Sequence, residues 1–445
     1  MRYYSTNHTA PLASLHDAVV GGLAPDRGLY MPERIQRLPA EFFDSIDKLT
    51  FQELSFEVAK AFFGEDVPEE DLKKIVTDTL AFDTPVVKVK DSIYALELFH
   101  GPTLAFKDVG ARFMARLLRY LVGKDRAVSH DDAHTSKEVN VLVATSGDTG
   151  SAVANGFLGV EGIHVYVLYP KGKVSPLQEC QFTTLGQNIT AIEVDGVFDD
   201  CQALVKQAFM DDDLKAHALY TSANSINVAR FLPQAFYYFN AYAQAKRQGL
   251  LDGGRELTVC VPSGNFGNIT AGLFAKRMGL PVSHFIAANN ANDVFYQYLL
   301  TGEYHPMASI QTLANAMDVG APSNFARILD LYGNSVEAIR KDISGATYSD
   351  DRIRETLKQC YSETGYILDP HGACGYQALQ EQLPKEGVGI FLETAHPAKF
   401  KDRVDPILGI DIPVPDRLQA FTLGQKKKEP LSKSFEEFKQ FLLKR

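Results

Sequence analysis

Six short and mainly apolar runs, separated by segments with helical spacing, constrain the fold more than any other feature of this sequence. They cover residues 139–144, 163–168, 189–194, 257–261, 285–288 and 388–392. Such runs are typical of strands that are buried on both faces, as in parallel sheets covered by helices. These runs alternate with helical patterns, such as 111–122 before the first run and 199–210 after the third, which indicates right-handed βαβ units. The sequence therefore predicts an α/β fold with open, mostly parallel sheets.

Helix signals lie on both sides of this α/β region. Thr50 and Glu53 form a predicted capping box, Gly64 marks the end of that helix, and a second helix is expected after Pro68. Near the C-terminus, the spacing of Ser434 to Glu437 and the apolar residues around them predict an amphipathic helix that docks on the body of the protein.

These patterns predict the organisation of the chain. We expect a mainly helical N-terminal domain at 1–88, an α/β domain at 89–428 with a smaller lobe at roughly 110–230, and a C-terminal helix at 429–445. The polar stretch 129–138 is expected to be an exposed loop. Ser175 and Pro176 are expected to start a helix that ends before Gly186.

Composition and charge exclude several classes of function. The 445 residues include 45 Lys and Arg against 55 Asp and Glu, and the resulting net charge of −10 disfavours binding to nucleic acid or a membrane surface. The sequence lacks a run of roughly 20 apolar residues and a secretion signal. Five cysteines without a C-x-x-C pair predict neither a disulfide framework nor a metal site. We therefore expect a cytoplasmic protein, a monomer or homodimer, whose partner is a small molecule.

The pattern S-G-[DN]-x-G occurs twice, each time after a predicted strand, which favours two related half-domains. One copy is 146–150, preceded by Thr145, and the other is 263–267. In the second copy, the backbone N–H groups of Gly264–Asn268 suit an anion such as phosphate, or the segment is a glycine-rich turn without a ligand. The hydroxyl groups of the first copy suit a carboxylate, or they cap the following helix.

Three further segments carry candidate chemistry. Lys107 follows an apolar stretch, so a partly buried amine could form a Schiff base, or Lys107 and Asp108 are a solvated surface pair. Residues 224–230 contain two amides, a hydroxyl and a guanidinium that suit a phosphate, or they form a capped helix. Thr394 lies at the carboxyl end of the last predicted strand, where α/β sheets bind ligands. The nearby His396 is either a general base or a turn histidine.

Together these motifs resemble those of threonine synthases, a family within the fold type II, tryptophan synthase β-like group of pyridoxal-phosphate enzymes. The resemblance covers most of the chain and is carried by six segments, which read LAPDRGLYMPE (23–33), HGPTLAFKD (100–108), ATSGDTGSA (144–152), NSINVAR (224–230), PSGNFGN (262–268) and ETAHPAKF (393–400). The resemblance implies two α/β sheet domains and the cofactor pyridoxal 5'-phosphate.

The resemblance also implies a role for each motif. Lys107 would bind the cofactor aldehyde as a Schiff base and carry out the proton transfers, and Thr394 would face the pyridine nitrogen. The cofactor phosphate would be held by the turn residues Gly264, Asn265, Phe266, Gly267 and Asn268. The substrate carboxylate would be bound by Thr145, Ser146 and Thr149, and the substrate phosphate by Ser225, Asn227 and Arg230.

Two positions depart from the family pattern. Asp148 stands where many fold type II enzymes have an asparagine beside the cofactor 3'-oxygen, and Arg27 stands where a small residue is expected. The implied reaction converts O-phospho-L-homoserine and water to L-threonine and phosphate, the last step of threonine biosynthesis. The alternatives are a phospho-lyase of the same fold acting on O-phosphothreonine or phosphohomoserine, and a non-catalytic protein that binds a phosphometabolite.

Overall fold

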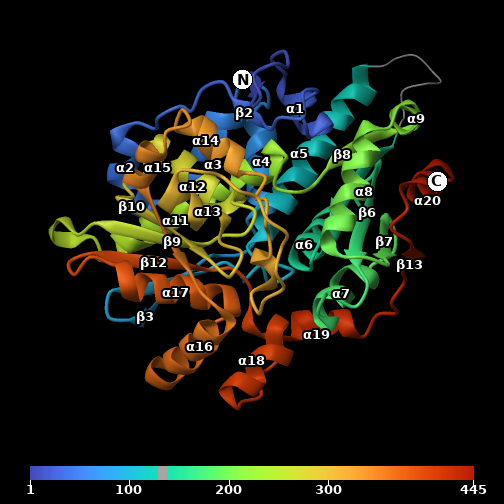
Figure 1. Cartoon of the computed structure of the whole chain (residues 1–445). Coiled ribbons are helices and arrows are strands. Elements are labelled where there is room, and N and C mark those ends of the chain that lie inside the picture. Colours follow the sequence, from blue (N-terminus) through green and yellow to red (C-terminus); the bar gives the residue numbers. More distant parts are fainter. Residues whose placement is uncertain (129–137) are drawn as a thin grey trace. The chain divides into compact units, whose positions relative to one another are not determined.

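The computed structural model describes residues 1–128 and 138–445, so the predicted loop at 129–138 lies, except for Glu138, outside the described residues. The chain forms two compact units (Figure 1). The large unit comprises Met1, Pro32–Phe106 and Phe231–Pro413, and the small unit comprises Arg2–Met31, Lys107–Arg230 and Val414–Arg445. The chain thus enters the small unit at Lys107 and leaves it after Arg230. The predicted domains at 1–88, 89–428 and 429–445 stay a prediction.

A six-stranded sheet with the order β11-β10-β9-β12-β4-β3 organises the large unit. Its strands are β3 (Val86–Lys90), β4 (Ile93–Glu97), β9 (Leu257–Pro262), β10 (His284–Asn289), β11 (Ile343–Thr347) and β12 (Val388–Glu393). Neighbouring strands are parallel except for the antiparallel pair β3 and β4. The predicted strands at 257–261, 285–288 and 388–392 are confirmed as β9, β10 and β12. The strands β3 and β11 have partly exposed positions, which removes the continuous apolar signal.

A five-stranded parallel sheet with the order β13-β7-β6-β5-β8 organises the small unit. Its strands are β5 (Val139–Ala144), β6 (Ile163–Pro170), β7 (Ile189–Val194), β8 (Leu219–Ser222) and β13 (Glu429–Leu431). The predicted strands 139–144, 163–168 and 189–194 are confirmed. The sequence did not predict β8 and β13, which are short and largely polar. The predicted α/β fold with two open, mostly parallel sheets is confirmed.

Helices connect and cover the strands of each sheet. Those of the large unit are α2 (Ala40–Ser45), η1 (Ile46–Lys48), α3 (Phe51–Phe63), α4 (Glu69–Thr79), η2 (Leu232–Gln234), α11 (Ala235–Arg247), η3 (Asp252–Gly254), α12 (Gly267–Arg277), α13 (Val294–Thr301), η4 (Asn315–Met317), α14 (Phe325–Leu331), α15 (Val336–Asp342), α16 (Asp350–Thr364), α17 (Pro370–Gln382), η5 (Pro397–Phe400) and α18 (Lys401–Leu408). Helix α17 packs against β9, β10 and β12.

The small unit has its own set of helices. They are α1 (Leu15–Gly21), α5 (Lys107–Val128), α6 (Asp148–Phe157), α7 (Pro176–Thr183), α8 (Phe198–Met210), α9 (Asp212–His217), α19 (Asp416–Thr422) and α20 (Phe435–Leu443), while α10 (Val228–Phe231) ends one residue beyond the unit boundary. Two short strands, β1 (Tyr3–Ser5) and β2 (Tyr30–Pro32), interrupt the predicted helical N-terminal region with a sheet of their own.

Helix caps predicted from the sequence are present at α3 and α7. The capping box of Thr50 and Glu53 is present, and Ser175 caps α7 with Pro176 in the first turn. The C-terminal helix α20 is also present and has Ser434 as its N-cap residue, but Ser434 makes no side-chain cap. The backbone N–H of Ser434 donates to the hydroxyl oxygen of Ser432 at 3.2 Å, and that hydroxyl donates to the carboxylate of Glu437.

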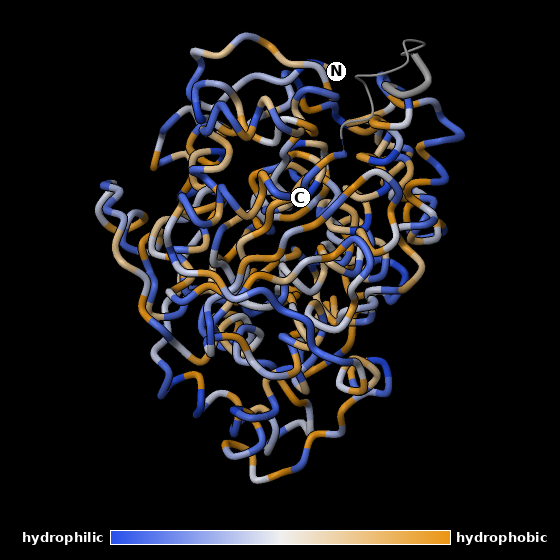
Figure 2. The backbone as a smooth tube through the Cα atoms, turned by 90° about the vertical axis from the view of Figure 1, so that its right-hand side faces the viewer, coloured by the Kyte–Doolittle hydropathy of each residue, from blue (hydrophilic) through white to orange (hydrophobic). Residues whose placement is uncertain are grey.

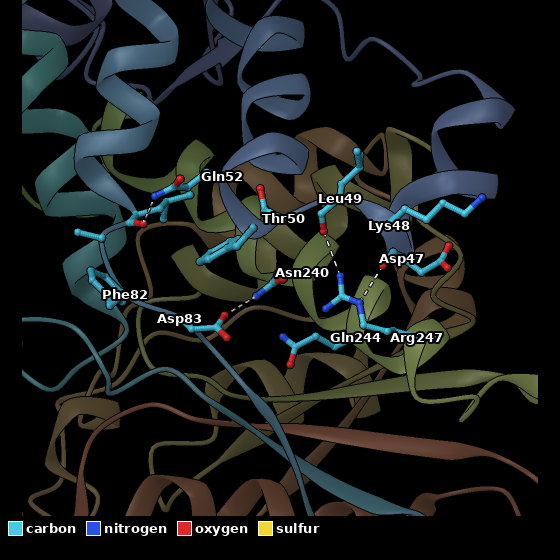
Figure 3. A pocket seen from close by; sticks show the side chains of 13 residues that line it. Asp47, Lys48, Leu49, Thr50, Gln52, Phe82, Asp83, Asn240, Gln244 and Arg247 are labelled. Carbon is cyan, nitrogen blue, oxygen red and sulfur yellow. Dashed lines mark hydrogen bonds between the residues drawn. The ribbon is translucent and has the colours of Figure 1, made fainter.

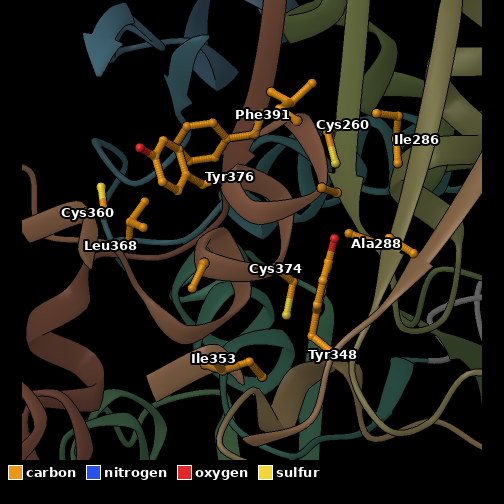
Figure 4. Packing of buried hydrophobic residues seen from close by; sticks show 14 of the residues in the cluster. Cys260, Ile286, Ala288, Tyr348, Ile353, Cys360, Leu368, Cys374, Tyr376 and Phe391 are labelled. Atoms are coloured by element: carbon orange, nitrogen blue, oxygen red, sulfur yellow. The ribbon is translucent and has the colours of Figure 1, made fainter. Parts of the chain in front are cut away.

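Each unit has a hydrophobic core beside its sheet. In the large unit, a cluster that includes Cys260, Cys374 and Phe391 packs between the sheet and α17 (Figure 4). In the small unit, Phe438 and Leu442 of α20 join the cluster beside β5, β6 and β7, so this helix docks as expected. The backbone trace shows hydrophobic stretches along interior strands and hydrophilic stretches in outer loops (Figure 2). Across the described residues, no helix combines the length and apolar character needed to span a membrane.

Candidate active site

The two copies of S-G-[DN]-x-G occupy equivalent places in the two units. In the small unit, the copy at 146–150 connects β5 to α6, and in the large unit, the copy at 263–267 connects β9 to α12. Each turn therefore lies at the carboxyl end of a central parallel strand and at the start of a helix. This is the position where open α/β sheets bind ligands and where helix N–H groups favour anions.

The large-unit turn approaches another backbone segment so closely that it requires glycine. A Cβ atom on Gly264 would lie 2.6 Å from the carbonyl oxygen of Ala316 and 2.8 Å from the Cα atom of Met317. Phe266 has a positive φ of 61° and precedes α12 without a side-chain cap. The first N–H groups of α12 thus have no capping side chain and remain suited to an anion.

Asn268, in the first turn of α12, has a buried amide whose orientation is fixed. Its Oδ1 atom accepts hydrogen bonds from the hydroxyls of Tyr237 and Tyr238, each at 2.7 Å. Because the oxygen is held there, the Nδ2 group must point the other way. This buried Nδ2 donor has no hydrogen-bond partner among the described residues. A buried donor without a partner is costly, so its orientation favours a bound acceptor.

The small-unit turn satisfies part of its own backbone. The Oγ1 atom of Thr145 accepts hydrogen bonds from the N–H groups of Gly147 at 2.9 Å and Gly150 at 2.8 Å. Its two acceptor sites are therefore used, and its O–H proton is the group it can offer to a ligand. The carboxylate of Asp148 accepts a hydrogen bond from Nε2 of Gln178 at 2.8 Å, so Gln178 fixes this side chain. Ser146 and Thr149 are partly buried.

Lys107 and Thr394 are each placed by regular structure. Lys107 is partly buried and is the first residue of α5. The backbone N–H of the preceding Phe106 donates to the carbonyl oxygen of Thr394 at 2.9 Å. Thr394 is buried and directly follows β12, so the hydroxyl lies at the carboxyl end of the strand as expected.

The predicted substrate-phosphate residues differ in how the fold uses them. The Nδ2 group of Asn227 donates to the carbonyl oxygens of Val19 at 2.9 Å and Ser222 at 3.1 Å, so both of its protons are engaged within the small unit. Arg230 is 2% exposed. Burial lowers the pKa of Arg230 to about 10, and the negative charge of Asp108 opposes this shift. Arg230 is thus a buried cation beside the helix that begins with Lys107, whereas Ser225 is partly buried.

Close packing supports this position of Arg230. A Cβ atom on Gly110 of α5 would lie 2.3 Å from the carbonyl oxygen of Arg230, so the glycine allows the two backbones to approach.

His396 lies in a turn before η5, and its Nδ1 accepts a hydrogen bond from the N–H of Ala398 at 3.1 Å. This contact agrees with the turn-histidine interpretation.

A separate groove in the large unit contains none of the predicted site residues (Figure 3). Its volume is about 600 Å³, and its polar walls are hydrogen-bonded to one another. Arg247 donates to the carbonyl oxygens of Asp47 and Leu49, at 2.8 and 3.0 Å, and Gln52 donates to that of Leu80 at 2.9 Å. Within the described part of the chain, no cluster of His, Cys, Asp or Glu side chains could hold a metal ion.

Three known families match the chain in sequence order. Residues 2–80 match "Threonine synthase N terminus", residues 78–392 match "Pyridoxal-phosphate dependent enzyme", and residues 372–442 match "Threonine synthase, C-terminal". The threonine synthase of Serratia marcescens is 44% identical over 443 residues, which cover 100% of this chain and 99% of that protein. The chain belongs to the threonine synthase family.

Solved structures of threonine synthases share its fold over the whole length. The crystal structure from Escherichia coli has a TM-score of 0.91 and 42% identity, and covers 100% of both chains. The pyridoxal-phosphate-bound structure from Brucella melitensis has a TM-score of 0.90 and 33% identity, and covers 100% of this chain and 99% of that chain. The chain is therefore a pyridoxal-phosphate-dependent lyase of fold type II. The predicted cofactor and enzyme class are confirmed, and the non-catalytic alternative is not supported.

The residues of the large-unit turn fit the cofactor of the threonine synthase family. A phosphate group offers several acceptor oxygens, and the turn offers the uncapped N–H groups of α12 together with the buried Nδ2 donor of Asn268. Gly264 keeps this position free of a side chain. Sequence reasoning found the turn but missed Tyr237 and Tyr238, which orient Asn268 from α11 and carry no local signal of that role.

Proposed function

We propose that this chain converts O-phospho-L-homoserine and water to L-threonine and phosphate. The observation that carries the proposal is the buried Arg230 guanidinium beside the helix of Lys107. A phosphate leaving group needs a cation within reach of the reacting amine, and an arginine can bind it through two parallel hydrogen bonds. An amino-acid substrate without a phosphate offers no second anion for this guanidinium to bind.

We also propose how the chain binds its cofactor. The N–H groups of Gly264–Asn268 and the amide of Asn268 hold the phosphate, Thr394 faces the pyridine nitrogen, Asp148 faces the 3'-oxygen, and Lys107 binds the aldehyde. Pyridoxal phosphate supplies the electron sink that stabilises a carbanion formed from the substrate. A neutral hydroxyl at Thr394 does not favour protonation of the ring nitrogen as a carboxylate would. Binding of the cofactor by the protein is checked by its visible absorbance band, which is lost in a Lys107→Ala variant.

The substrate roles follow from the donors of the small unit. The O–H group of Thr145, with Ser146 and Thr149, binds the α-carboxylate, and Arg230 with Ser225 binds the phosphate. Asn227 shapes this phosphate site through its backbone contacts, so its part in the proposal is indirect. The amine of Lys107 takes the α-proton and then a proton from Cβ, so that phosphate leaves from Cγ. A proton is then delivered to Cγ, water adds at Cβ, and a proton returns to Cα.

Product analysis tests this function directly. Purified protein with added cofactor and phosphohomoserine should release phosphate and threonine in equal amounts. Formation of 2-oxobutanoate and ammonia, from this substrate or from O-phosphothreonine, would instead support the phospho-lyase alternative. An Arg230→Ala variant that kept normal turnover would remove the main support for the phosphate site.

We further propose that the protein acts in the cytoplasm as a monomer or homodimer. All five cysteines are buried and free, which fits a reducing compartment. The oligomeric state is checked by light scattering of the purified protein.

A further inference from the structure

Asp369 connects the start of α17 to the residue after Thr394. Its Oδ1 atom caps the helix by accepting hydrogen bonds from the N–H groups of His371 at 2.5 Å and Gly372 at 3.2 Å. Its Oδ2 atom leaves the helix and accepts a hydrogen bond from the N–H of Ala395 at 3.1 Å. Asp369 is 0% exposed, so both contacts are shielded from water. A cap alone needs one oxygen, and the second oxygen serves the Thr394 segment.

The peptide group between Thr394 and Ala395 is held from both sides. Its N–H donates to Asp369, and its carbonyl oxygen accepts from the N–H of Phe106 at 2.9 Å. Phe106 immediately precedes Lys107 in the sequence. The position of this peptide group therefore determines the position of the Thr394 side chain and of the backbone just before α5, which begins at Lys107.

His371 connects the same carboxylate to the segment beneath the large-unit turn. Its Nδ1 atom lies 2.6 Å from Oδ1 of Asp369, and its Nε2 atom lies 3.1 Å from the backbone nitrogen of Ala316. A backbone N–H can only donate, so Nε2 must be the acceptor. The ring proton then lies on Nδ1 and is donated to Asp369. The imidazole is therefore fixed as one neutral tautomer, and it is 2% exposed.

Ala316 packs against Gly264, the first glycine of the turn. Its carbonyl oxygen would lie 2.6 Å from a Cβ atom on Gly264. Ala316 therefore lies directly against the start of the turn at 264–268. Asp369 and His371 lie at the N-terminal end of α17. Cys374 and Tyr376 of the same helix are buried in the core of the large unit (Figure 4).

We propose that Asp369 and His371 are positioning residues for the cofactor, which tie the hydroxyl for its ring nitrogen and the turn for its phosphate to one rigid helix. The inference rests on the proposed roles of Thr394 and Gly264–Asn268. It goes beyond them by assigning a task to two buried residues that have no place among the proposed cofactor contacts. Oδ2 of Asp369 binds the Thr394 segment, and Oδ1 binds His371, which in turn contacts the segment beside the turn. The spacing between Thr394 and the turn is therefore set by a single carboxylate.

An Asp369→Asn variant separates this role from helix capping. Asparagine is as good a cap as aspartate, and its oxygen can still accept from His371 and Gly372. Its amide nitrogen cannot accept the N–H of Ala395, so the link to Thr394 is broken. A His371→Leu variant removes the acceptor for Ala316, whereas His371→Gln offers one acceptor and one donor and should restore part of the link. The matched control is Cys374→Ala, which removes a core contact of the same helix and leaves both links intact.

The measurement is the dissociation constant of pyridoxal phosphate, obtained by titrating the apo-protein and following the visible absorbance band. We expect Asp369→Asn and His371→Leu to weaken binding by about tenfold or more, because each leaves a buried N–H without an acceptor. We also expect the band to shift in Asp369→Asn, because Thr394 moves relative to the ring. His371→Gln should bind more tightly than His371→Leu. Cys374→Ala should lower the melting temperature of the apo-protein with little effect on cofactor binding.

The opposite pattern would overturn the inference. If Asp369→Asn and His371→Leu bind the cofactor as tightly as the unmodified protein, with an unchanged band, the pair has no positioning role. The same conclusion follows if the losses in affinity merely track the losses in melting temperature, as in Cys374→Ala. The unmodified protein tests the proposed function separately: if it shows no visible band and no turnover, the proposed function fails, whereas normal binding and turnover in it and in all variants refutes the positioning pair alone.

Discussion

The two glycine-rich turns have the same sequence pattern but use it differently. In the small unit, the hydroxyl of Thr145 accepts the N–H groups of Gly147 and Gly150, so the turn caps itself. In the large unit, the residue at the equivalent position is Pro262, which has no hydroxyl and cannot cap Gly264 or Gly267 in this way. One residue before the pattern thus decides whether the backbone donors are used within the turn or are open to an anion. This difference supports the proposal that the open turn holds the cofactor phosphate and the capped turn binds the smaller charge of a carboxylate.

The largest loss of turnover is expected when the amine of Lys107, which both turns are proposed to serve, is removed. A Lys107→Ala variant should lose turnover by about 1,000-fold or more, because neither turn can replace a base and nucleophile. The rate of phosphate release measures the loss. Lys124→Ala, an exposed lysine on the same helix, is the control and should keep normal turnover. Comparable rates in the two variants would contradict the role of Lys107.

An Asn268→Asp variant tests whether the large-unit turn is the open one. The change keeps an oxygen for Tyr237 and Tyr238 but replaces the buried donor with a second acceptor that repels phosphate. The dissociation constant of pyridoxal phosphate should rise by about a hundredfold. Pyridoxal, which lacks the phosphate, serves as the control ligand and should lose much less affinity. Equal losses for both ligands would place the phosphate elsewhere.

A Thr145→Val variant tests whether the small-unit turn is capped. Without the hydroxyl, two buried N–H groups lose their acceptor, and the free energy of unfolding should fall by about 1–3 kcal/mol. The KM for phosphohomoserine should also rise, because the O–H donor is lost, while cofactor affinity stays close to normal. Thr145→Ser keeps the hydroxyl and should recover most of both losses. Denaturant unfolding and steady-state kinetics measure the two effects, and a change in cofactor affinity alone would reverse the assignment of the two turns.

The smallest expected effect concerns how the stability of the protein changes with pH. In the large unit, burial lowers the pKa of His396 to about 4. The unfolded chain therefore binds a proton below about pH 6.5 that the folded chain resists, so stability is lost as the pH falls. This residue should account for about 1 kcal/mol of the stability lost between pH 6 and pH 5. His396→Asn keeps a cap for η5 and should lose correspondingly less over that interval in unfolding experiments. An identical pH dependence in both proteins would contradict the lowered pKa, because it would show that His396 binds its proton equally well in the folded and unfolded chain.

Local signals allowed much of the fold to be predicted from the sequence. The strands β5, β9 and β12 are mainly apolar and are buried along their whole length, and Ser175 followed by Pro176 defines a helix start without help from distant residues. The strands β8 and β11 escaped because their positions are partly exposed and polar. The spacing of Ser434 and Glu437 does not reveal that Ser432, two residues earlier, binds both the N–H of Ser434 and the carboxylate of Glu437.

The candidate site was predictable in its motifs but not in its supports. The turn at 263–267 and the hydroxyl of Thr394 follow from strand ends. The contact of His371 with Ala316 joins residues 55 positions apart, and it cannot be inferred from the spacing of either segment. The same limit applies to Asn227, whose amide is engaged by Val19, 208 positions away. Long-range backbone contacts of this kind need the tertiary structure.

The points at which the chain passes between its two units have a practical consequence. The central block of the small unit begins with Lys107 and ends with Arg230. A chimera made by exchanging this block with that of another family member would carry the proposed reactive amine and the guanidinium together, on a graft with its own parallel strands. The host would keep the glycine turn at 264–268 and Thr394. Such hybrids would show which half of the enzyme dictates the choice of leaving group.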